Sequence, residues 1–285
     1  MKAMSMQFLK TISAFYEDAL EKGDPRVESW FLMKNPIPVF VIFILYLLMV
    51  KYGPKFMQNR EPWNLRLIIV PYNALMVALS TYMFYEVLVS AVLARYSLKC
   101  QPVDYSSNPL AVRMASVCWW YCFSKILELL DTLFFILRKK NNQLTFLHVF
   151  HHSTMLINWW FYTKYVAGGQ SFITVLLNTF VHMIMYSYYG LAAIGPQMQK
   201  YLWWKKYMTK LQLLQFFTGM THTIINMASD CDFPRAFNNV TFAYGIIFIS
   251  LFMNFYYQQY VAKSKHIENG KDQNGIVRNG IDKQK

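Results

Sequence analysis

The sequence has little charge and little cysteine, and each shortage excludes a class of protein. Charged residues make up 15% of the 285 positions, whereas soluble chains carry about 25%. Four cysteines are too few for a scaffold held together by disulfides. Residues 1–35 contain no apolar run of the kind found in a cleavable signal peptide. We therefore expect neither an ordinary soluble domain nor a disulfide scaffold, and no cleaved leader.

Apolar residues are abundant instead. They make up 55% of the chain, and aromatic residues make up 18%. Disorder requires low hydrophobicity, so it is excluded for most of the chain. The formal net charge of +13 would favour nucleic-acid binding in a soluble protein, but the basic residues here lie between apolar runs. We therefore expect an all-α membrane protein with no nucleic-acid partner, whose basic face meets anionic substrates.

The apolar runs predict seven transmembrane helices. Most are close to the length that a helix needs to cross about 30 Å of hydrocarbon. The first is short, and the middle four contain polar residues. The predicted spans are Pro36–Val50, Leu67–Leu93, Met114–Leu137, Leu144–Val166, Gln170–Ile194, Tyr207–Ala228 and Val240–Val261.

Basic residues in the loops predict the orientation. One set of alternate loops, with the adjoining helix ends, holds eleven lysines and arginines, and the other set holds five. The richer side is expected in the cytosol, which places the N-terminus in the lumen and the C-terminus in the cytosol. Three regions follow: a lumenal segment 1–35 with a short amphipathic helix near Phe8–Ala19, a catalytic membrane domain 36–261, and a flexible cytosolic tail 262–285.

Four consecutive predicted helices each carry one polar stripe. Ionisable groups at this depth are costly and usually face a protein interior. Within each helix the polar residues fall on an arc of roughly 100–120°. The stripes contain Lys125, Glu128, Asp131 and Thr132; His148, His151 and His152; Asn178, His182, Met185, Tyr186 and Tyr189; and Thr209, Gln212 and Gln215. They predict a buried chamber that opens toward the basic face.

The stripes leave several functions open. They could be hydrogen-bonding contacts between helices, and a seven-span receptor would need nothing more. A zinc hydrolase could use Asp131, His148, His152 and His182 as ligands. In a metal-free enzyme, one imidazole would attack a thioester while its neighbour or Asp131 manages the proton. Basic residues at the mouth would then bind the phosphates of an anionic carrier, and the candidates are Arg138, Lys139, Lys205 and Lys206.

The four stripes also form recognisable boxes. The chain reads Lys125-x-x-Glu128-x-x-Asp131-Thr132, then His148-Val-Phe-His151-His152, then Asn178-x-x-x-His182-x-x-Met185-Tyr186-x-Tyr188-Tyr189, then Thr209-x-x-Gln212-x-x-Gln215. In this order and spacing they resemble the fatty acid elongase (ELO) family of the endoplasmic reticulum, over about residues 25–262. The form of the histidine box is most similar to the animal very-long-chain branch, including its polyunsaturated members.

The resemblance implies a function. It implies a 3-ketoacyl-CoA synthase that condenses a long-chain acyl-CoA with malonyl-CoA by a ping-pong course, with helices two to seven enclosing an acyl tunnel. An acyl-imidazole would form on His151, and His182 would be its close partner. No cofactor or metal is implied. The reductases and the dehydratase of the elongation cycle are expected partners alongside membrane lipid. A homodimer and the acyl chain length stay open.

The implied site divides into two groups. The catalytic group is His148, His151, His152, His182, Asp131 and Glu128, in which Asp131 and Glu128 orient the histidines. The substrate-binding group is Lys125, Asn178, Tyr186, Tyr189, Gln212, Gln215, Arg138, Lys139, Lys205 and Lys206.

The expected lumenal face carries two further sites. Cys100 and Cys231 lie in loops on that face, and disulfides persist in the endoplasmic reticulum lumen, so we expect them to pair. Asn239-Val-Thr241 is a glycosylation sequon, although it lies close to the seventh span. At the other end, a Lys-x-Lys-x-x retrieval signal would need a lysine at position 281. Lys283 is present, but Ile281 is not a lysine.

Overall fold

The computed structural model describes residues 2–262, and this part of the chain is helical. The tail beyond residue 262, with Lys283 and Ile281, lies outside the described residues. The α-helices are α1 (Lys2–Glu21), α2 (Ile37–Phe56), α3 (Arg66–Leu93), α4 (Pro109–Leu137), α5 (Phe146–Val166), α6 (Phe172–Ile194), α7 (Lys205–Met227) and α8 (Arg235–Tyr256). A π-helical turn, Tyr257–Ala262, continues α8, and short 3-10 turns occur at Asn141–Gln143, Gly169–Ser171 and Pro196–Tyr201.

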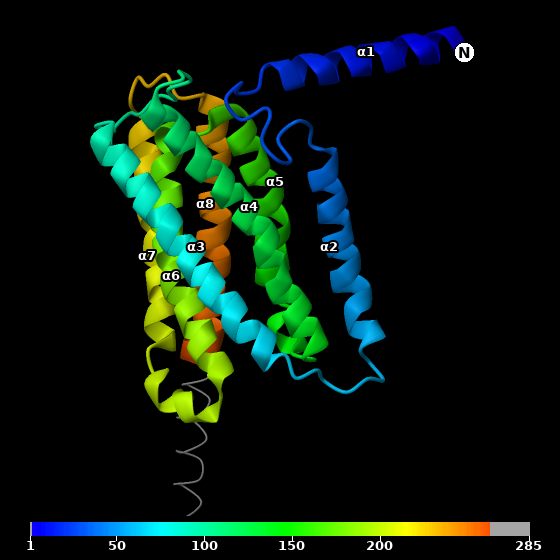
Figure 1. Ribbon diagram of the computed structural model, residues 1–285, viewed down its shortest axis with the longest axis vertical. Helices are drawn as coiled ribbons and strands as arrows, with labels where there is room; N and C mark the ends of the chain where they lie inside the picture. Colours follow the sequence, from blue (N-terminus) through cyan, green and yellow to red (C-terminus); the bar gives the residue numbers. More distant parts are fainter. Residues whose placement is uncertain (1, 263–285) are drawn as a thin grey trace, which may run out of the picture.

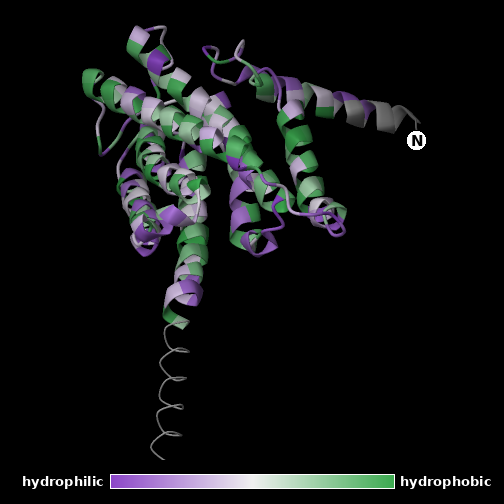
Figure 2. Ribbon diagram, turned by 60° about the horizontal axis from the view of Figure 1, so that its bottom comes forward, coloured by the Kyte–Doolittle hydropathy of each residue, from purple (hydrophilic) through white to green (hydrophobic). Residues whose placement is uncertain are grey.

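Within residues 2–262, four helical segments are long and apolar enough to cross a membrane. They are Ile37–Phe56, Arg66–Leu93, Gly169–Ile194 and Arg235–Ala262. The helices α4, α5 and α7 have 29, 21 and 23 residues, but their polar stripes leave them outside this set. They nevertheless run alongside the apolar helices (Figure 1). Hydrophilic residues gather at the ends of the bundle and hydrophobic ones along the helices (Figure 2).

Several helices extend beyond the predicted apolar runs. The helix α2 continues past Val50 to Phe56, so Lys51 and Lys55 lie in its last turns rather than in a loop. The helix α4 begins at Pro109, where the side chain of Asn108 accepts a hydrogen bond of 2.9 Å from the Leu110 amide. Hydropathy marks where a helix is apolar, whereas such capping residues set where it begins.

Six of the helices form a closed ring. The helix α3 packs against α4 and α6, α4 packs against α5, α5 meets α8, α8 packs against α7, and α7 returns to α6. The helix α2 stands outside this ring and packs on α4 and α5 (Figure 1). The polar stripes of α4, α5, α6 and α7 are therefore carried by helices of the ring.

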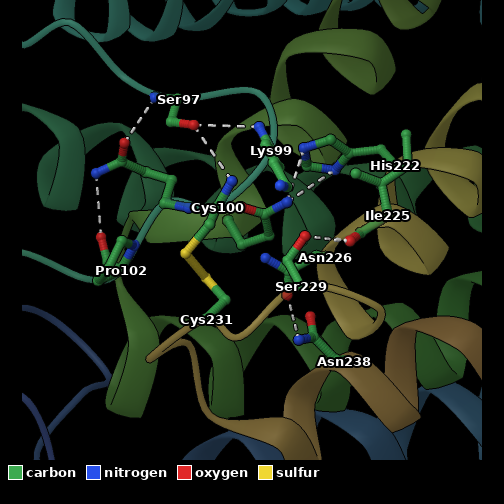
Figure 3. The surroundings of a disulfide bond; sticks show 12 residues. Ser97, Lys99, Cys100, Pro102, His222, Ile225, Asn226, Ser229, Cys231 and Asn238 are labelled. Atoms are coloured by element: carbon green, nitrogen blue, oxygen red, sulfur yellow. Dashed lines mark hydrogen bonds between the residues drawn. A yellow bond between two sulfur atoms is a disulfide. The ribbon is translucent and has the colours of Figure 1, made fainter.

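One end of the bundle, which we call the disulfide end, is tied by a covalent bond. Cys100, in the loop after α3, is joined to Cys231, in the loop after α7, with a Cα–Cα distance of 5.5 Å. This is the pair expected from the sequence, 131 residues apart. The neighbouring Gln170 accepts a hydrogen bond from the Gln101 amide and contacts Nε2 of His222 at 2.8 Å. Figure 3 shows the Cys100–Cys231 bond with His222 beside it. The bond and its surroundings thus connect three loops.

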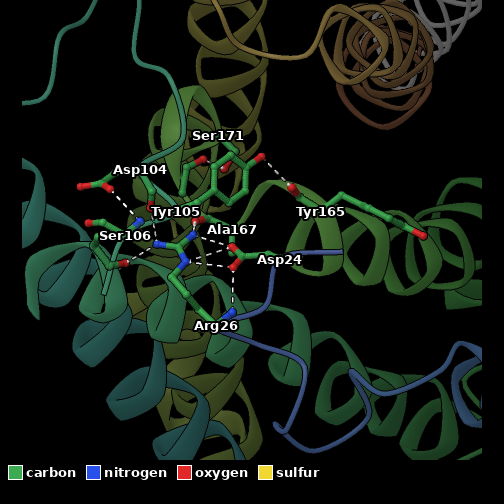
Figure 4. A network of polar contacts seen from close by, with 10 residues as sticks. Asp24, Arg26, Asp104, Tyr105, Ser106, Tyr165, Ala167 and Ser171 are labelled. Carbon is green, nitrogen blue, oxygen red and sulfur yellow. Dashed lines mark hydrogen bonds and ion pairs between the residues drawn. The ribbon is translucent and has the colours of Figure 1, made fainter. Parts of the chain in front are cut away.

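The segment after α1 is held to the same end by Arg26. Its guanidinium forms a buried ion pair with Asp24 and donates to the carbonyl oxygens of Ala111 and Ala167 at 3.1 and 2.9 Å, and to that of Asp104 (Figure 4). Arg26 therefore links three separate parts of the chain through its hydrogen bonds. The helix α1, longer than the predicted Phe8–Ala19, projects crosswise from this point (Figure 1).

Candidate active site

The polar stripe of α4 centres on a buried ion pair. Lys125 and Glu128 are 2% and 1% exposed, and Lys125 Nζ lies 2.7 Å from Glu128 Oε1. The same carboxylate oxygen lies 3.3 Å from Nδ1 of His182 on α6. Because an unpaired charge at this depth is costly, Lys125 stabilises the carboxylate that faces His182. Glu128 therefore lies within ion-pair distance of one histidine, His182, and its predicted role in orienting the histidines stays a prediction.

Asn178 joins this pair to an internal cavity. Its Oδ1 accepts hydrogen bonds from the Tyr121 hydroxyl at 2.5 Å and from Lys125 Nζ at 3.4 Å. Two donors on the carbonyl oxygen fix the orientation of the side-chain amide. The amide nitrogen is then available to the cavity that Asn178 lines.

The histidine box lies in the first turns of α5. Thr145 caps the helix by accepting a hydrogen bond of 3.2 Å from the amide of His148. The ring of His148 lies 4.2 Å from that of His152, and the ring of His151 lies 5.2 Å from that of His152, centroid to centroid. The sequence-predicted trio therefore forms one continuous cluster of imidazoles.

His151 is the member of this cluster that lines the cavity. The cavity follows α5 from His151 to Tyr162, eleven residues or about 16 Å of helix. At the far end, the Tyr162 hydroxyl contacts Thr241 Oγ1 at 2.5 Å and donates to the Phe237 carbonyl at 2.6 Å. The other lining residues are Tyr121, Met155, Asn158, Trp159, Thr174, Leu177, Asn178, Gln215, Phe216, Gly219, Met220, Tyr244, Gly245 and Phe248.

Asp131 has a different partner from the one expected. Its Oδ2 accepts a hydrogen bond of 2.8 Å from the hydroxyl of Tyr186 on α6, and the described contacts bring it to no histidine. The ring of Tyr189 in turn lies 6.0 Å from that of Tyr186. The prediction that Asp131 orients the histidine box is therefore wrong for this arrangement: Asp131 holds the tyrosines of α6.

The two glutamines of α7 lie at different places. Gln215 lines the cavity, and its Oε1 is buried without a hydrogen-bond partner among residues 2–262. Gln212 lies 3.7 Å from the sulfur of Met185 instead. Of the two, Gln215 is placed to meet a molecule in the cavity.

The basic residues lie at the end of the bundle opposite the disulfide end, which we call the basic end. Arg138 lines a separate cavity of about 240 Å³ with Arg66 and Asn64. The ammonium group of Lys139 is hydrogen-bonded within the protein, because Nζ donates to the carbonyl oxygens of Gln58 and Arg60 at 2.9 and 3.0 Å.

The lysines of α7 share this end. Lys205 is exposed at the first residue of the helix. Lys206 lies over the rings of Tyr256 and Tyr260. The four predicted residues therefore share an end of the molecule without forming one cluster.

The family model and the similar proteins found for this chain all point to one family. The family model described as the GNS1/SUR4 family (ELO) matches residues 31–268. The chain is 50% identical to very long chain fatty acid elongase 4 of Homo sapiens over 269 residues, which cover 94% of this chain and 86% of that protein. It is 48% identical to elongase 7 of Rattus norvegicus over 90% of this chain and 93% of that protein, and 43% identical to elongase 2 of Mus musculus over 96% of both.

The chain belongs to the ELO family. It is a multi-pass membrane protein and a fatty acid elongase, the enzyme of the condensing step of chain elongation and a 3-ketoacyl-CoA synthase. The resemblance of the four polar boxes to this family is therefore confirmed.

The elongase does not have the arrangement of a zinc hydrolase. Within residues 2–262, the His, Cys, Asp and Glu side chains form no group of three that could hold a metal ion. Asp131 lies against Tyr186, and His182 lies against Glu128. The alternative ligand set of Asp131, His148, His152 and His182 is therefore not assembled.

The predicted glycosylation sequon does not lie in a loop. Asn239 is exposed, but it lies in the first turns of α8, and the Thr241 hydroxyl is bonded to Tyr162 and to the Phe237 carbonyl. A sequon whose threonine is held inside a helix is poorly placed for modification.

Three residues of the elongase site were not found from the sequence. Tyr121 bonds Asn178, Tyr162 lines the cavity at the end farther from His151, and Tyr46 of α2 reaches the histidine box through Thr132. All three are tyrosines, in α2, α4 and α5, that belong to none of the polar stripes named from the sequence. A buried tyrosine hydroxyl needs a hydrogen-bond partner, and this was the available signal, although it does not identify the partner.

Proposed function

We propose that this elongase joins a long-chain acyl-CoA to malonyl-CoA in two half-reactions, and that His151 carries the acyl group between them. The observation that supports this most directly is the position of His151 at the boundary between the imidazole cluster and the cavity. An acyl chain extending from His151 would run toward Tyr162 between apolar and aromatic side chains. The names of this protein's relatives suggest that very-long-chain acyl groups are the substrates.

In the first half-reaction, an unprotonated ring nitrogen of His151 attacks the thioester carbonyl. The C–S bond breaks, and CoA leaves with the proton that the other ring nitrogen gives up. Asn178, with its amide nitrogen free for the cavity, is positioned to donate to the oxygen that becomes negative in the transition state. The product is a neutral acyl-imidazole in a chamber with little access to water.

In the second half-reaction, malonyl-CoA loses CO2 and its enolate carbon attacks the acyl carbon. The C–N bond to His151 breaks, the imidazole takes up one proton, and 3-ketoacyl-CoA leaves. His182, held by Glu128, is the group we assign to the proton transfers. No cofactor or metal enters either step.

The basic end would receive the CoA moieties. We assign Arg138, Lys205 and Lys206 to the CoA phosphates, because they surround the end at which α5 and its histidines begin. Lys139 supports this end indirectly by holding the loop at Gln58 and Arg60.

The fold supports a seven-span topology. The helices α2 to α8 would be the spans, with α3 to α8 as the ring around the acyl cavity. The basic end would face the cytosol, and the disulfide end would face the endoplasmic reticulum lumen, where a disulfide persists. Residues 1–35 would then be lumenal, residues 36–261 the catalytic domain and residues 262–285 a cytosolic tail. The 3-ketoacyl product requires the reductases and the dehydratase of the elongation cycle as functional partners.

The test uses purified protein with an acyl-CoA and malonyl-CoA labelled at its free carboxyl group. We expect labelled CO2 to be released only when both substrates are present, together with parallel lines in double-reciprocal plots. Release without acyl-CoA, or intersecting lines, would contradict the two half-reactions. The control variant is Asn158→Ala, which changes a cavity residue away from the imidazoles. A loss of CO2 release in this variant would come from a change in the cavity and not from the histidines.

A further inference from the structure

The helix α2 reaches the histidine box although it stands outside the ring. It has only two buried residues, Val39 and Tyr46. Tyr46 is 3% exposed, and its hydroxyl lies 3.2 Å from Oγ1 of Thr132 on α4. The otherwise lipid-facing helix therefore places one polar group in the protein interior.

The contact continues to the first histidine of the box. Thr132 is fully buried, and its Oγ1 lies 2.7 Å from Nε2 of His148 on α5. Three side chains from three helices thus form one chain of hydrogen bonds, Tyr46–Thr132–His148. Its last member packs against His152.

Counting hydrogens gives this chain a direction. Each hydroxyl has one hydrogen to donate, and within residues 2–262 the Tyr46 hydroxyl has no other hydrogen-bond partner. If Tyr46 donates to Thr132, then Thr132 donates to Nε2 of His148 and every hydroxyl hydrogen is used. The opposite direction would leave the buried Tyr46 O–H without an acceptor, which is unfavourable. In the favoured direction, His148 is neutral and carries its ring hydrogen on Nδ1.

We propose that Tyr46 is a positioning residue of the elongase, which acts through Thr132 to set the tautomer and the ring orientation of His148. The helix α2 then belongs to the catalytic unit and is more than a membrane anchor. His148 then carries its hydrogen on Nδ1, and protonation at Nε2 would require the Thr132 hydroxyl hydrogen to turn away from the ring. This inference depends on the proposed function only in taking the histidine box as the catalytic centre.

The kinetic test compares Tyr46→Phe and Thr132→Val with two controls. Thr132→Ser keeps the hydroxyl, and Tyr52→Phe alters an exposed tyrosine of the same helix. We expect kcat to fall about tenfold or more in Tyr46→Phe and Thr132→Val, the size of effect seen when a residue that orients a functional histidine is lost. KM should stay near the wild-type value in both variants, and Tyr46→Phe should keep the wild-type melting temperature. Thr132→Val should melt at a lower temperature, because it leaves the buried Tyr46 hydroxyl without its partner. Thr132→Ser should keep the wild-type kcat. Unchanged kcat in Tyr46→Phe, or kcat lost in proportion to folded protein, would overturn the proposal.

A second measurement does not depend on turnover. Solid-state NMR of protein labelled with 15N-histidine in lipid should show one histidine with an unprotonated Nε2 that accepts a hydrogen bond, and this signal should change in Thr132→Val. A protonated Nε2 on His148 in the wild-type protein would contradict the inference. If His151 carried no acyl group while this signal was present, the proposed function would fail and the positioning role would stand.

Discussion

At the scale of single residues, the site depends on one carboxylate oxygen. Glu128 Oε1 contacts Lys125, His182 and the hydroxyl of Ser124. It therefore couples a buried cation to a candidate catalytic imidazole. Without Glu128, Lys125 would be a buried charge with no opposite charge beside it, a loss that costs about 3–5 kcal/mol for buried pairs in general.

We expect Glu128→Gln to lower kcat by roughly 100-fold or more, the range that a positioned acid–base group contributes, and to lower the folded yield as well. Asp131→Asn provides the contrast, because an amide oxygen can still accept the hydrogen bond from Tyr186. Its loss of kcat should be clearly smaller. Steady-state kinetics normalised to folded protein measures both, and equal losses in the two variants would contradict the separate roles.

At the scale of helices, α5 and α8 meet at the end of the cavity farther from His151, and we take this contact as the floor of the acyl site. Tyr162 and Thr241 meet there through their hydroxyls. The distance of about 16 Å from His151 accommodates about 12 carbons of extended chain at ~1.3 Å per carbon. Longer acyl groups therefore have to bend or to displace this floor.

Removing the floor should change the products. We expect Tyr162→Ala to shift the longest product upward by roughly two to four carbons, because the ring no longer blocks the chain at ~1.3 Å per carbon. The matched control is Phe161→Ala, the adjacent and more exposed aromatic residue. Chromatography of the elongated acyl groups gives the profile, and identical profiles for Tyr162→Ala and wild-type protein would show that the chain ends elsewhere.

The basic end offers a second prediction at this scale. Charge reversal at Arg138 together with Lys205 should raise KM for both acyl-CoA and malonyl-CoA, because each carries the same phosphates. Reversal of Arg95 together with Lys99, both exposed in the loop between α3 and Cys100, is the control of equal charge change at the disulfide end. A rise in KM for both double and control variants would indicate a general effect of net charge instead of binding at the basic end.

At the scale of the whole molecule, the disulfide joins distant parts of the chain. The loop that it closes contains α4 to α7, so it restrains most of the ring. Thiol labelling of the denatured protein should modify two cysteines before reduction, Cys118 and Cys122, and four after it. The double variant Cys100→Ser with Cys231→Ser should lose about 2–4 kcal/mol of stability. Four labelled thiols without reduction would show that the bridge is absent.

Much of this architecture could be predicted from the sequence. The helices α4 to α7 and their polar faces follow from spacing alone, because residues three or four apart share a face of a helix. The closed order of the ring and the partner of Asp131 could not be predicted. Which helix lies beside which depends on packing between distant segments, and Tyr186 and Asp131 are 55 residues apart. Tyr46 was missed for the same reason, since nothing in the apolar run around it indicates a contact with Thr132 or His148.

The central claim is that His151 becomes acylated, and intact mass spectrometry tests it most directly. Protein incubated with an acyl-CoA alone should gain the mass of one acyl group, and peptide mapping should place that group on His151. The variant His151→Ala should show no adduct, whereas Tyr46→Phe, which leaves His151 in place, should still form it. An adduct that persists in His151→Ala, or one mapped to His182, would contradict the account.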